Sequence, residues 1–331
     1  MKFHIGYRTI KTAVGAMISI LLAQYLGLEN FVSSGILTIL CIKATKKKSL
    51  RASWDRILAC VIGIVFSIVL FEVIGYHPIV IGLLLLFFIP TVVLFKASDG
   101  VASSSVIILH FYSSKQVTID FILNELGIIS IGIGVALIAN LYMPSLDHKI
   151  EEYRYKIEAN FQKIFLEIVN YLRVGESNWD GKEITETIQL LEEGKALSFR
   201  AMENHFIQHD DLNYNYFKMR EKQFEIIERV LPIVTTISHT VEQGKTIADF
   251  IEELADHIHS GNTAVIYLKK LHQMSLSFEE MELPKTRKEF EVRADLLHFI
   301  KEMEQYLNIK SKFKGIKESM NANEKIGVEG N

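Results

Sequence analysis

The sequence predicts an all-α protein, in which a six-span helical membrane domain is followed by a cytoplasmic helical bundle. Three observations predict this fold class. Apolar runs fill residues 1–144, charged residues at helical spacing fill most of the remainder, and the net charge changes sign at the same boundary. Residues 1–144 carry 11 Lys and Arg against 6 Asp and Glu, a net of +5, and since the whole chain is −3, residues 145–331 carry −8. The boundary between the domains is therefore expected near Pro144.

Four apolar runs are close to the roughly 20 residues that a helix needs to cross a bilayer core of about 30 Å. They are residues 10–28, 57–75, 78–95 and 121–143. The third run begins at Pro78, and proline is well tolerated there because the first N–H groups of a helix have no partner within the helix. A soluble core does not need four such runs so close together, so each is predicted to span the membrane.

Two further runs are shorter, residues 31–43 (FVSSGILTILCIK) and residues 100–112 (GVASSSVIILHFY). A run of this length either crosses with its polar end in the headgroup zone or is a re-entrant piece, and both alternatives stay open. The six runs form two groups of three with the short run in the middle of each. Inverted repeats with short segments at matching positions are typical of secondary transporters, and these segments point to the binding site.

The distribution of Lys and Arg predicts the orientation. With a cytoplasmic N-terminus and six crossings, ten basic residues of the membrane domain face the cytoplasm and Lys115 alone faces outward. This excess agrees with the positive-inside rule. We expect a multi-pass protein of the plasma membrane, in contact with the lipid bilayer and with both termini in the cytoplasm. Glu29, Asp120 and Glu125 are then expected near the outer surface.

Residues 145–309 are predicted to form the cytoplasmic bundle. Its first helix has apolar residues at three- and four-residue spacing, from Ile157 through Phe161 to Leu172, and similar stripes continue as far as Leu307. Such stripes are the core of a helix bundle far more often than a cofactor site. Helical stripes can also pair between chains, which leaves a homo-oligomer open. The polar residues 310–331 lack periodicity and are predicted to be disordered.

The motifs of several enzyme classes are missing from the sequence. No GxxxxGK[ST], HExxH or GxSxG stretch is present, which argues against P-loop, zinc-protease and serine-hydrolase chemistry. His257 and His259 are two residues apart and do not share a helix face. The acidic C-terminal half disfavours nucleic acid, which needs a basic surface. We therefore predict a protein that is not an enzyme, with no cofactor, no bound metal and no nucleic-acid partner.

Small polar and ionisable residues in or beside the spans mark the candidate transport site, because a charge in hydrocarbon is costly and faces a partner or water. A helix that starts within the membrane offers free N–H groups and a positive dipole end to an anion. The predicted substrate-binding residues are Ser33, Ser34, Gly35, Lys43, Lys96, Ser103, Ser104 and Ser105. The predicted coupling residues are Asp99, Glu72 and His110. Alternatively, the two lysines only anchor the topology, and Glu72 and His110 only reach the outer interface.

Three stretches carry a resemblance to a known family: HIGYRTIKTAVGAMISILLAQYLGL, SSGILTILCIKATKKKSLRASWDRILACVIGI and LYMPSLDHKIEEYR. The chain resembles the aromatic acid exporter family, of the Gram-positive type with a C-terminal helical domain, which is related to the fusaric acid resistance transporters. The resemblance implies a secondary transporter that exports small organic anions such as aromatic acids. Two alternatives stay open: a membrane scaffold or regulator whose cytoplasmic bundle recruits a partner, and an anion channel.

Overall fold

The structure is a computed structural model, and it describes residues 6–204, 211–237, 241–259 and 263–313. Within these ranges the chain is helical throughout, with no strand, which confirms the predicted all-α class. The described residues up to Pro144, together with Glu203 and Asn204, form one compact unit, and the other described residues form a second. We call them the N-terminal and the C-terminal unit. From residue 314 onward, the predicted disordered tail lies outside the described residues.

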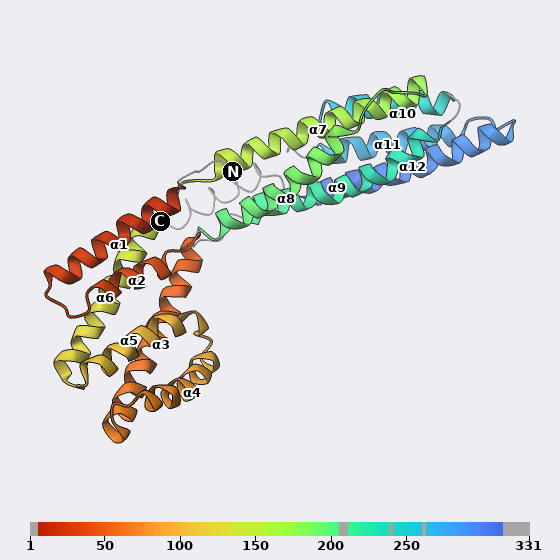
Figure 1. Cartoon of the computed structure of the whole chain (residues 1–331). Helices are drawn as coiled ribbons and strands as arrows, with labels where there is room; N and C mark the ends of the chain where they lie inside the picture. The colour runs from red at the N-terminus through yellow and green to blue at the C-terminus, as the bar shows by residue number, and fades with distance from the viewer. Residues whose placement is uncertain (1–5, 205–210, 238–240, 260–262, 314–331) are drawn as a thin grey trace, which may run out of the picture. The chain divides into compact units, whose positions relative to one another are not determined.

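The N-terminal unit contains six α-helices and one 3-10 turn (Figure 1). They are α1 (Tyr7–Tyr25), α2 (Val32–Cys41), α3 (Lys46–Ile74), α4 (Pro78–Leu94), η1 (Ser98–Gly100), α5 (Val101–Ser114) and α6 (Ile119–Leu141). Helix α1 packs against α2 and α6, α2 also packs against α6, and α3 packs against α4, α5 and α6. The short helices α2 and α5 therefore each lie against one of the two long helices.

Two helices of this unit are long and apolar enough to cross a membrane by length and composition, α3 and α6. Helices α2 and α4 are apolar but shorter. Many large apolar side chains of the unit point outward, among them Ile79, Val73, Leu94, Ile138 and Leu86. An outward apolar surface of this extent is typical of contact with lipid. Six crossings remain a prediction.

Glycines allow two pairs of helices to approach closely in this unit. A Cβ atom at Gly132 of α6 would lie 2.7 Å from the carbonyl oxygen of Ser34 on α2. A Cβ atom at Gly100, just before α5, would lie 2.5 Å from the carbonyl oxygen of Asp55 on α3. These distances are shorter than a carbon and an oxygen atom tolerate, so the two backbones approach this closely only because a side chain is absent.

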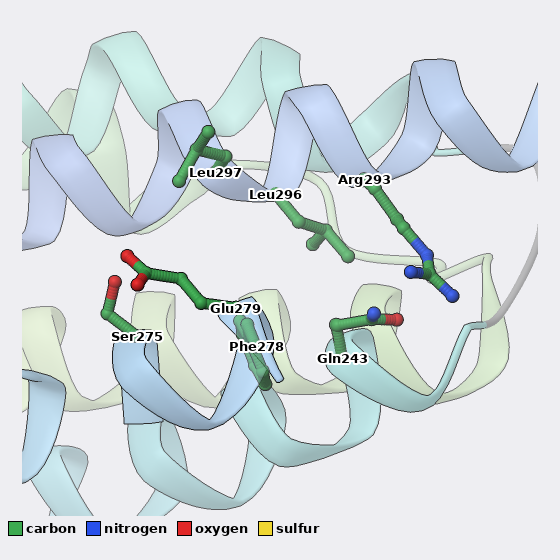
Figure 2. A pocket seen from close by; sticks show the side chains of 7 residues that line it. All are labelled: Gln243, Ser275, Phe278, Glu279, Arg293, Leu296 and Leu297. Carbon is green, nitrogen blue, oxygen red and sulfur yellow. The ribbon is translucent and has the colours of Figure 1, made fainter. Parts of the chain in front are cut away.

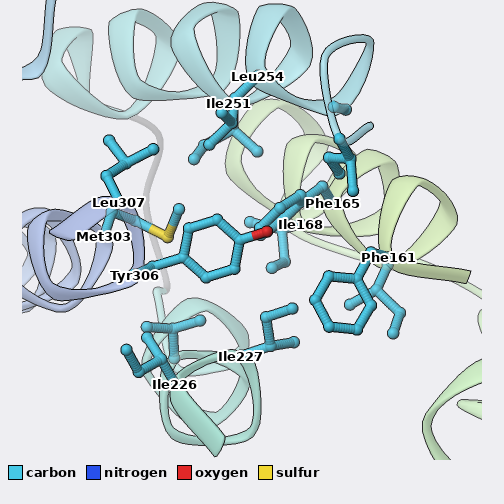
Figure 3. Packing of buried hydrophobic residues seen from close by; sticks show 14 of the residues in the cluster. Phe161, Phe165, Ile168, Ile226, Ile227, Ile251, Leu254, Met303, Tyr306 and Leu307 are labelled. Atoms are coloured by element: carbon cyan, nitrogen blue, oxygen red, sulfur yellow. The ribbon is translucent and has the colours of Figure 1, made fainter. Parts of the chain in front are cut away.

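The C-terminal unit contains α7 (Asp147–Val174), α8 (Lys182–Met202), α9 (Asp211–Thr235), α10 (Glu242–Ala255), α11 (Ala264–Glu279) and α12 (Arg287–Ser311). Helix α7 packs against α8 and α10, while α9 packs against α8 and α12. The predicted stripe of α7 lies in the core, where Phe161, Phe165 and Ile168 are fully buried. Figure 3 shows these side chains facing Ile227 of α9, Ile251 of α10 and Tyr306 of α12. The unit is thus a helical bundle with its own hydrophobic core.

One fully buried arginine lies inside this bundle. Arg220 of α9 donates from Nε to the Tyr216 hydroxyl at 3.1 Å and from Nη2 to Glu158 Oε1 at 3.2 Å. The same Nη2 donates to the Ile258 carbonyl at 3.0 Å, and Nη1 donates to Gln223 Oε1 at 3.1 Å. A buried charge is tolerated when it is paired and hydrogen-bonded, so Arg220 has a structural explanation within this network.

Candidate functional site

A polar cavity of about 440 Å³ lies in the N-terminal unit, where the α2–α3 and α4–α5 connections meet. We call it the basic cavity. Its lining residues are Lys43, Lys48, Arg51, Ala52, Asp55, Lys96, Ser98 and Asp99. Three residues that the sequence singled out, Lys43, Lys96 and Asp99, therefore line one cavity although they are up to 56 positions apart. The cavity volume falls within the range of small-molecule sites.

Local chain geometry brings these side chains together. Helix α3 begins after Thr45, whose hydroxyl accepts the Lys48 N–H at 3.3 Å as an N-cap. Lys96 takes a left-handed backbone conformation with φ of 58° directly after α4, which turns the chain into η1. The α2–α3 and α4–α5 connections, each only a few residues long, therefore both border the same cavity.

The charges of the lining residues favour an anion. Four cationic side chains line the basic cavity, Lys43, Lys48, Arg51 and Lys96, against the carboxylates of Asp55 and Asp99, and Lys48 is also paired with Glu203 at 2.9 Å. A cleft lined mainly by one sign of charge raises the local concentration of the opposite ion. The two carboxylates limit the excess positive charge, so an anion is attracted without being held permanently.

Arg56 of α3 is a candidate functional residue that the sequence reasoning missed. It is 3% exposed, its Nη1 donates to the Ala52 carbonyl at 2.9 Å, and its Nε has no hydrogen-bond partner in the described part of the chain. Ala52 itself lines the basic cavity, so the guanidinium lies beside the cavity wall. A buried guanidinium with an unfilled donor is costly, and an anion would satisfy it with charge-assisted hydrogen bonds.

No local pattern in the sequence points to this role for Arg56. Arg56 stands at the start of an apolar run, next to Asp55, and there an arginine is expected to anchor the end of a span. Its burial follows from how α3 packs against its neighbours, which the spacing of residues within α3 does not reveal.

The three serines at the start of α5 do not present their hydroxyl groups to the cavity. Ser103 donates to the Gly100 carbonyl at 2.9 Å, and Ser104 donates to the same carbonyl at 2.8 Å. Ser105 donates to the Val101 carbonyl at 2.8 Å. The hydroxyls are thus bonded within their own helix, and the predicted contact of Ser103, Ser104 and Ser105 with substrate stays a prediction.

The small residues at the start of α2 have different surroundings. The N–H groups of Ser33 and Ser34 donate to the carbonyls of Asn30 and Phe31 at 2.9 and 3.1 Å, so neither is left free for an anion. A Cβ atom at Gly35 would lie 2.6 Å from Ile20 Cδ1, so this glycine permits close packing of α1 and α2. Ser33 lies against His110, seven residues beyond Ser103 and therefore about 10 Å further along α5. Ser33 and Ser34 therefore lie at a different height along α5 from Ser103, Ser104 and Ser105.

The Ser33 hydroxyl begins a chain of hydrogen bonds through three helices. Its Oγ lies 3.0 Å from His110 Nε2, and His110 Nδ1 lies 2.8 Å from Glu125 Oε2 on α6. The sequence predicts Glu125 on the outer side of the membrane, near its surface, and in the structure its side chain is fully buried within the unit. Glu125 stands four residues after buried Phe121 and seven before buried Gly132, which places it on the packed face of α6. Glu72, another of the three predicted coupling residues, is exposed near the end of α3.

A smaller cavity of about 260 Å³ lies in the C-terminal unit between α10, α11 and α12 (Figure 2). Its lining includes Gln243, Phe278, Leu296 and Arg293. The Arg293 guanidinium already donates to the Glu282 carbonyl at 2.6 Å and to Glu289 Oε1 at 2.5 Å. Because these contacts occupy the cation, this cavity is a weaker anion site than the basic cavity. Within the described ranges no group of three metal-binding side chains occurs.

Comparison with known proteins identifies the family. Residues 3–143 match the model described as "Aromatic acid exporter family member 1", and residues 147–311 match the "Putative aromatic acid exporter C-terminal domain". The chain is also 60% identical over 315 residues to the uncharacterized protein YqjA of Bacillus subtilis strain 168, covering 95% of this chain and 98% of that protein. The chain belongs to the aromatic acid exporter family. Membership in this family of membrane transporters agrees with the expectation that the chain is not an enzyme.

The chain also has more distant similarities. The UPF0421 protein YgaE of Bacillus subtilis is 22% identical over 272 residues, which cover 82% of this chain and 68% of YgaE. A crystal structure from Clostridium difficile 630 has a TM-score of 0.43 and 20% sequence identity, over 49% of this chain and 96% of that chain. The family resemblance predicted from the sequence is confirmed by the two family models.

Proposed function

We propose that this aromatic acid exporter family member is a secondary transporter that exports small organic anions, with aromatic carboxylates as the first candidates. The observation that carries the proposal is the basic cavity with the buried Arg56 beside its wall. The lysines and Arg51 raise the local concentration of anions. The Arg56 guanidinium then binds the carboxylate, for which its planar fork of donors is well suited.

The remaining predictions about the site belong to the same proposal. Ser33, Ser34, Gly35 and Ser103 to Ser105 lie on the two short helices that would border the path, and Asp99, Glu72 and His110 are its proposed coupling residues. The protein would lie in the plasma membrane with six crossings and both termini in the cytoplasm. A homo-oligomer is compatible with the helical stripes of the C-terminal unit.

Flux measurements on the full chain test this function. The purified protein is reconstituted into vesicles that contain radiolabelled benzoate, and its efflux is compared with that of protein-free vesicles. We expect faster efflux that saturates with benzoate concentration, because a transporter has a limited number of binding sites. Arg56→Gln removes the guanidinium and should reduce the efflux to the protein-free rate. Lys115→Gln removes an exposed cation outside the cavity and should leave the rate unchanged.

Other results would identify the alternatives. Efflux that rises in proportion to benzoate concentration without saturation would favour an anion channel. Efflux equal to that of protein-free vesicles, over a panel of aromatic carboxylates, would favour the scaffold. Normal efflux in Arg56→Gln would show that the substrate path avoids the basic cavity.

A further inference from the structure

The hydrogen-bonded chain of Ser33, His110 and Glu125 is separate from the basic cavity and has its own chemistry. Its two hydrogen bonds measure 3.0 Å and 2.8 Å. The Glu125 side chain is fully buried, whereas the His110 side chain is 14% exposed. The chain thus runs from an enclosed carboxylate to a ring that reaches the surface of the unit.

The second carboxylate oxygen of Glu125 also has a partner. Asn124 Nδ2 donates to Glu125 Oε1 at 3.3 Å and to the Glu29 carbonyl at 3.2 Å, and Asn124 Oδ1 accepts the Glu29 N–H at 2.7 Å. These bonds connect α6 to the α1–α2 connection. Both Glu125 oxygens are therefore held, which fixes the orientation of the carboxylate toward the imidazole.

We propose that Ser33, His110 and Glu125 form a proton-binding site that takes up and releases one proton in each transport cycle. The inference rests on the proposed transport function. In the deprotonated state Glu125 is ionised, His110 is neutral with its proton on Nδ1, and the Ser33 hydroxyl donates to the Nε2 lone pair. A hydronium ion then transfers a proton to Nε2: its O–H bond breaks and leaves water, the N–H bond forms, and the hydroxyl rotates to accept this new N–H. No other bond forms or breaks.

The proton changes the charge of the site from −1 to zero. A net charge in a low-dielectric interior is strongly unfavourable, so the protonated, neutral form is favoured until the site is exposed to a less acidic solution. An organic anion in the same unit is repelled by the deprotonated form and not by the protonated one. Proton occupancy and anion occupancy are thereby connected through their electrostatic interaction.

The elements packed against this site carry other ionisable side chains. Cys60 of α3 lies within electrostatic reach of Glu125. The others on these elements include Cys41 of α2, Arg56 and Glu72 of α3, Tyr112 of α5, Asp120 of α6 and Glu29 of the α1–α2 connection. Lys11 of α1 lies beside Met143, beyond the opposite end of α6. In the described part of the chain, Glu125 accepts side-chain hydrogen bonds from His110 and Asn124 only.

A serine, a histidine and a carboxylate in this order also resemble a hydrolase triad. That chemistry needs backbone N–H groups directed at a developing oxyanion. The N–H groups of Ser33 and Ser34 instead donate to the carbonyls of Asn30 and Phe31. Proton binding requires no such donors, so it is the function that this geometry supports.

Proton-coupled flux tests the inference. Vesicles loaded with radiolabelled benzoate are placed under a pH gradient, and the efflux rate is compared with the rate without a gradient. We expect the gradient to accelerate efflux by the wild-type protein, and Glu125→Gln to lose this acceleration because the amide keeps the site uncharged. Exchange of labelled for unlabelled benzoate without a gradient should persist in Glu125→Gln. Asp120→Asn, the same change at an exposed carboxylate of α6, is the matched control and should behave as wild type.

The failures of the two proposals are distinguishable. No wild-type efflux above the protein-free rate contradicts the transport function itself. Wild-type efflux that ignores the gradient, or a Glu125→Gln variant that keeps the full acceleration, overturns the proton site and leaves the transport function standing.

A second measurement does not depend on the folding of a Glu125 variant or on benzoate. The wild-type protein with ¹⁵N-labelled histidine is titrated in nanodiscs by NMR, with the His110 signals assigned by their absence in His110→Gln. We expect Nδ1 to stay protonated while Nε2 gains a proton on acidification, within the pH range in which the protein stays folded. Ser33→Ala should move the midpoint. A ring that keeps one protonation state throughout this range would overturn the inference.

Discussion

Arg56 and Glu125 are opposite charges buried in the same unit, and their surroundings differ. Glu125 has a histidine within 2.8 Å and an amide on its other oxygen. Arg56 has a single carbonyl as its hydrogen-bond partner in the described part of the chain, and its Nε is unpaired. A buried pair can be purely structural, whereas a buried charge with an open donor can accept a further hydrogen-bond partner such as an anion. The two residues therefore support different roles, proton binding and anion binding.

Lys310 of α12 provides a prediction at the same scale. It is 4% exposed, and burial, with the nearby Arg220 charge, lowers the pKa of its ammonium group to about 7. The folded state thus disfavours the charged form, while the unfolded chain keeps the ordinary pKa of 10.5. Below the folded pKa both states are protonated and the full destabilisation applies. Between about pH 7 and 10.5 the unfolded state binds more protons, so stability rises with pH.

Lys310→Met should therefore stabilise the protein most below pH 7, and its advantage should shrink as the pH approaches 10.5. The slope is at most about 1.4 kcal/mol per pH unit. Thermal unfolding of wild type and variant across this range measures the difference. Lys312→Met serves as the control, because it is the same change at the exposed C-cap of α12. A constant difference between wild type and Lys310→Met at every pH would contradict the prediction.

At the scale of elements, close backbone contacts hold α2 against α6 and α5 against α3. The Gly132 contact is reinforced by Thr38, whose hydroxyl lies 2.8 Å from the Gly132 carbonyl. Such contacts replace the hydrophobic effect as the force between helices in lipid. They also limit what a bulky substitution at Gly35 can show. Gly35→Leu would fill space needed by Ile20, so it is expected to disturb the packing of α1 on α2 and does not isolate an effect on transport.

Gly132→Ala tests the α2–α6 contact. Its Cβ would lie 2.7 Å from the Ser34 carbonyl oxygen, so the helices must separate, and overpacking of this kind typically costs about 1–3 kcal/mol. Gly134→Ala, two residues away, meets nothing within 4 Å and is the matched control. Thermal unfolding in detergent should show a lower midpoint for Gly132→Ala alone. Equal midpoints for the two variants would contradict the assigned contact.

At the scale of the whole molecule, the two compact units coincide with the two family models to within a few residues. The N-terminal unit has outward apolar side chains, as a membrane unit requires, and the C-terminal unit has an internal core with charged residues outside. This difference supports the proposal that the first unit lies in the bilayer and the second in water.

The proposed topology is tested by labelling in intact cells. Cysteines substituted at Lys115 and at Lys47, both exposed, are treated with a membrane-impermeant maleimide. We expect the reagent to modify position 115 and spare position 47, because the positive-inside rule places the Lys-rich connection in the cytoplasm. The native Cys41 and Cys60 are buried and provide the unlabelled background. Modification of position 47 would contradict the orientation.

The sequence by itself determined the helical class, the change of character near Pro144 and the family. These properties are local, since apolar runs and three- to four-residue stripes are visible along the chain without knowing what packs against them. In the C-terminal unit the stripe of α7 also predicts which side is buried, because water allows only one apolar face.

The site was decided by the tertiary structure. Lys43, Lys96 and Asp99 carried a sequence signal, but their common cavity depends on two connections meeting in space. The burial of Arg56 and the alignment of Ser33, His110 and Glu125, which come from three different helices, had no such signal. The physical reason is the solvent. In a membrane helix the side facing lipid and the side facing protein are both apolar, so periodicity does not reveal which side is packed, and only the arrangement of the helices does.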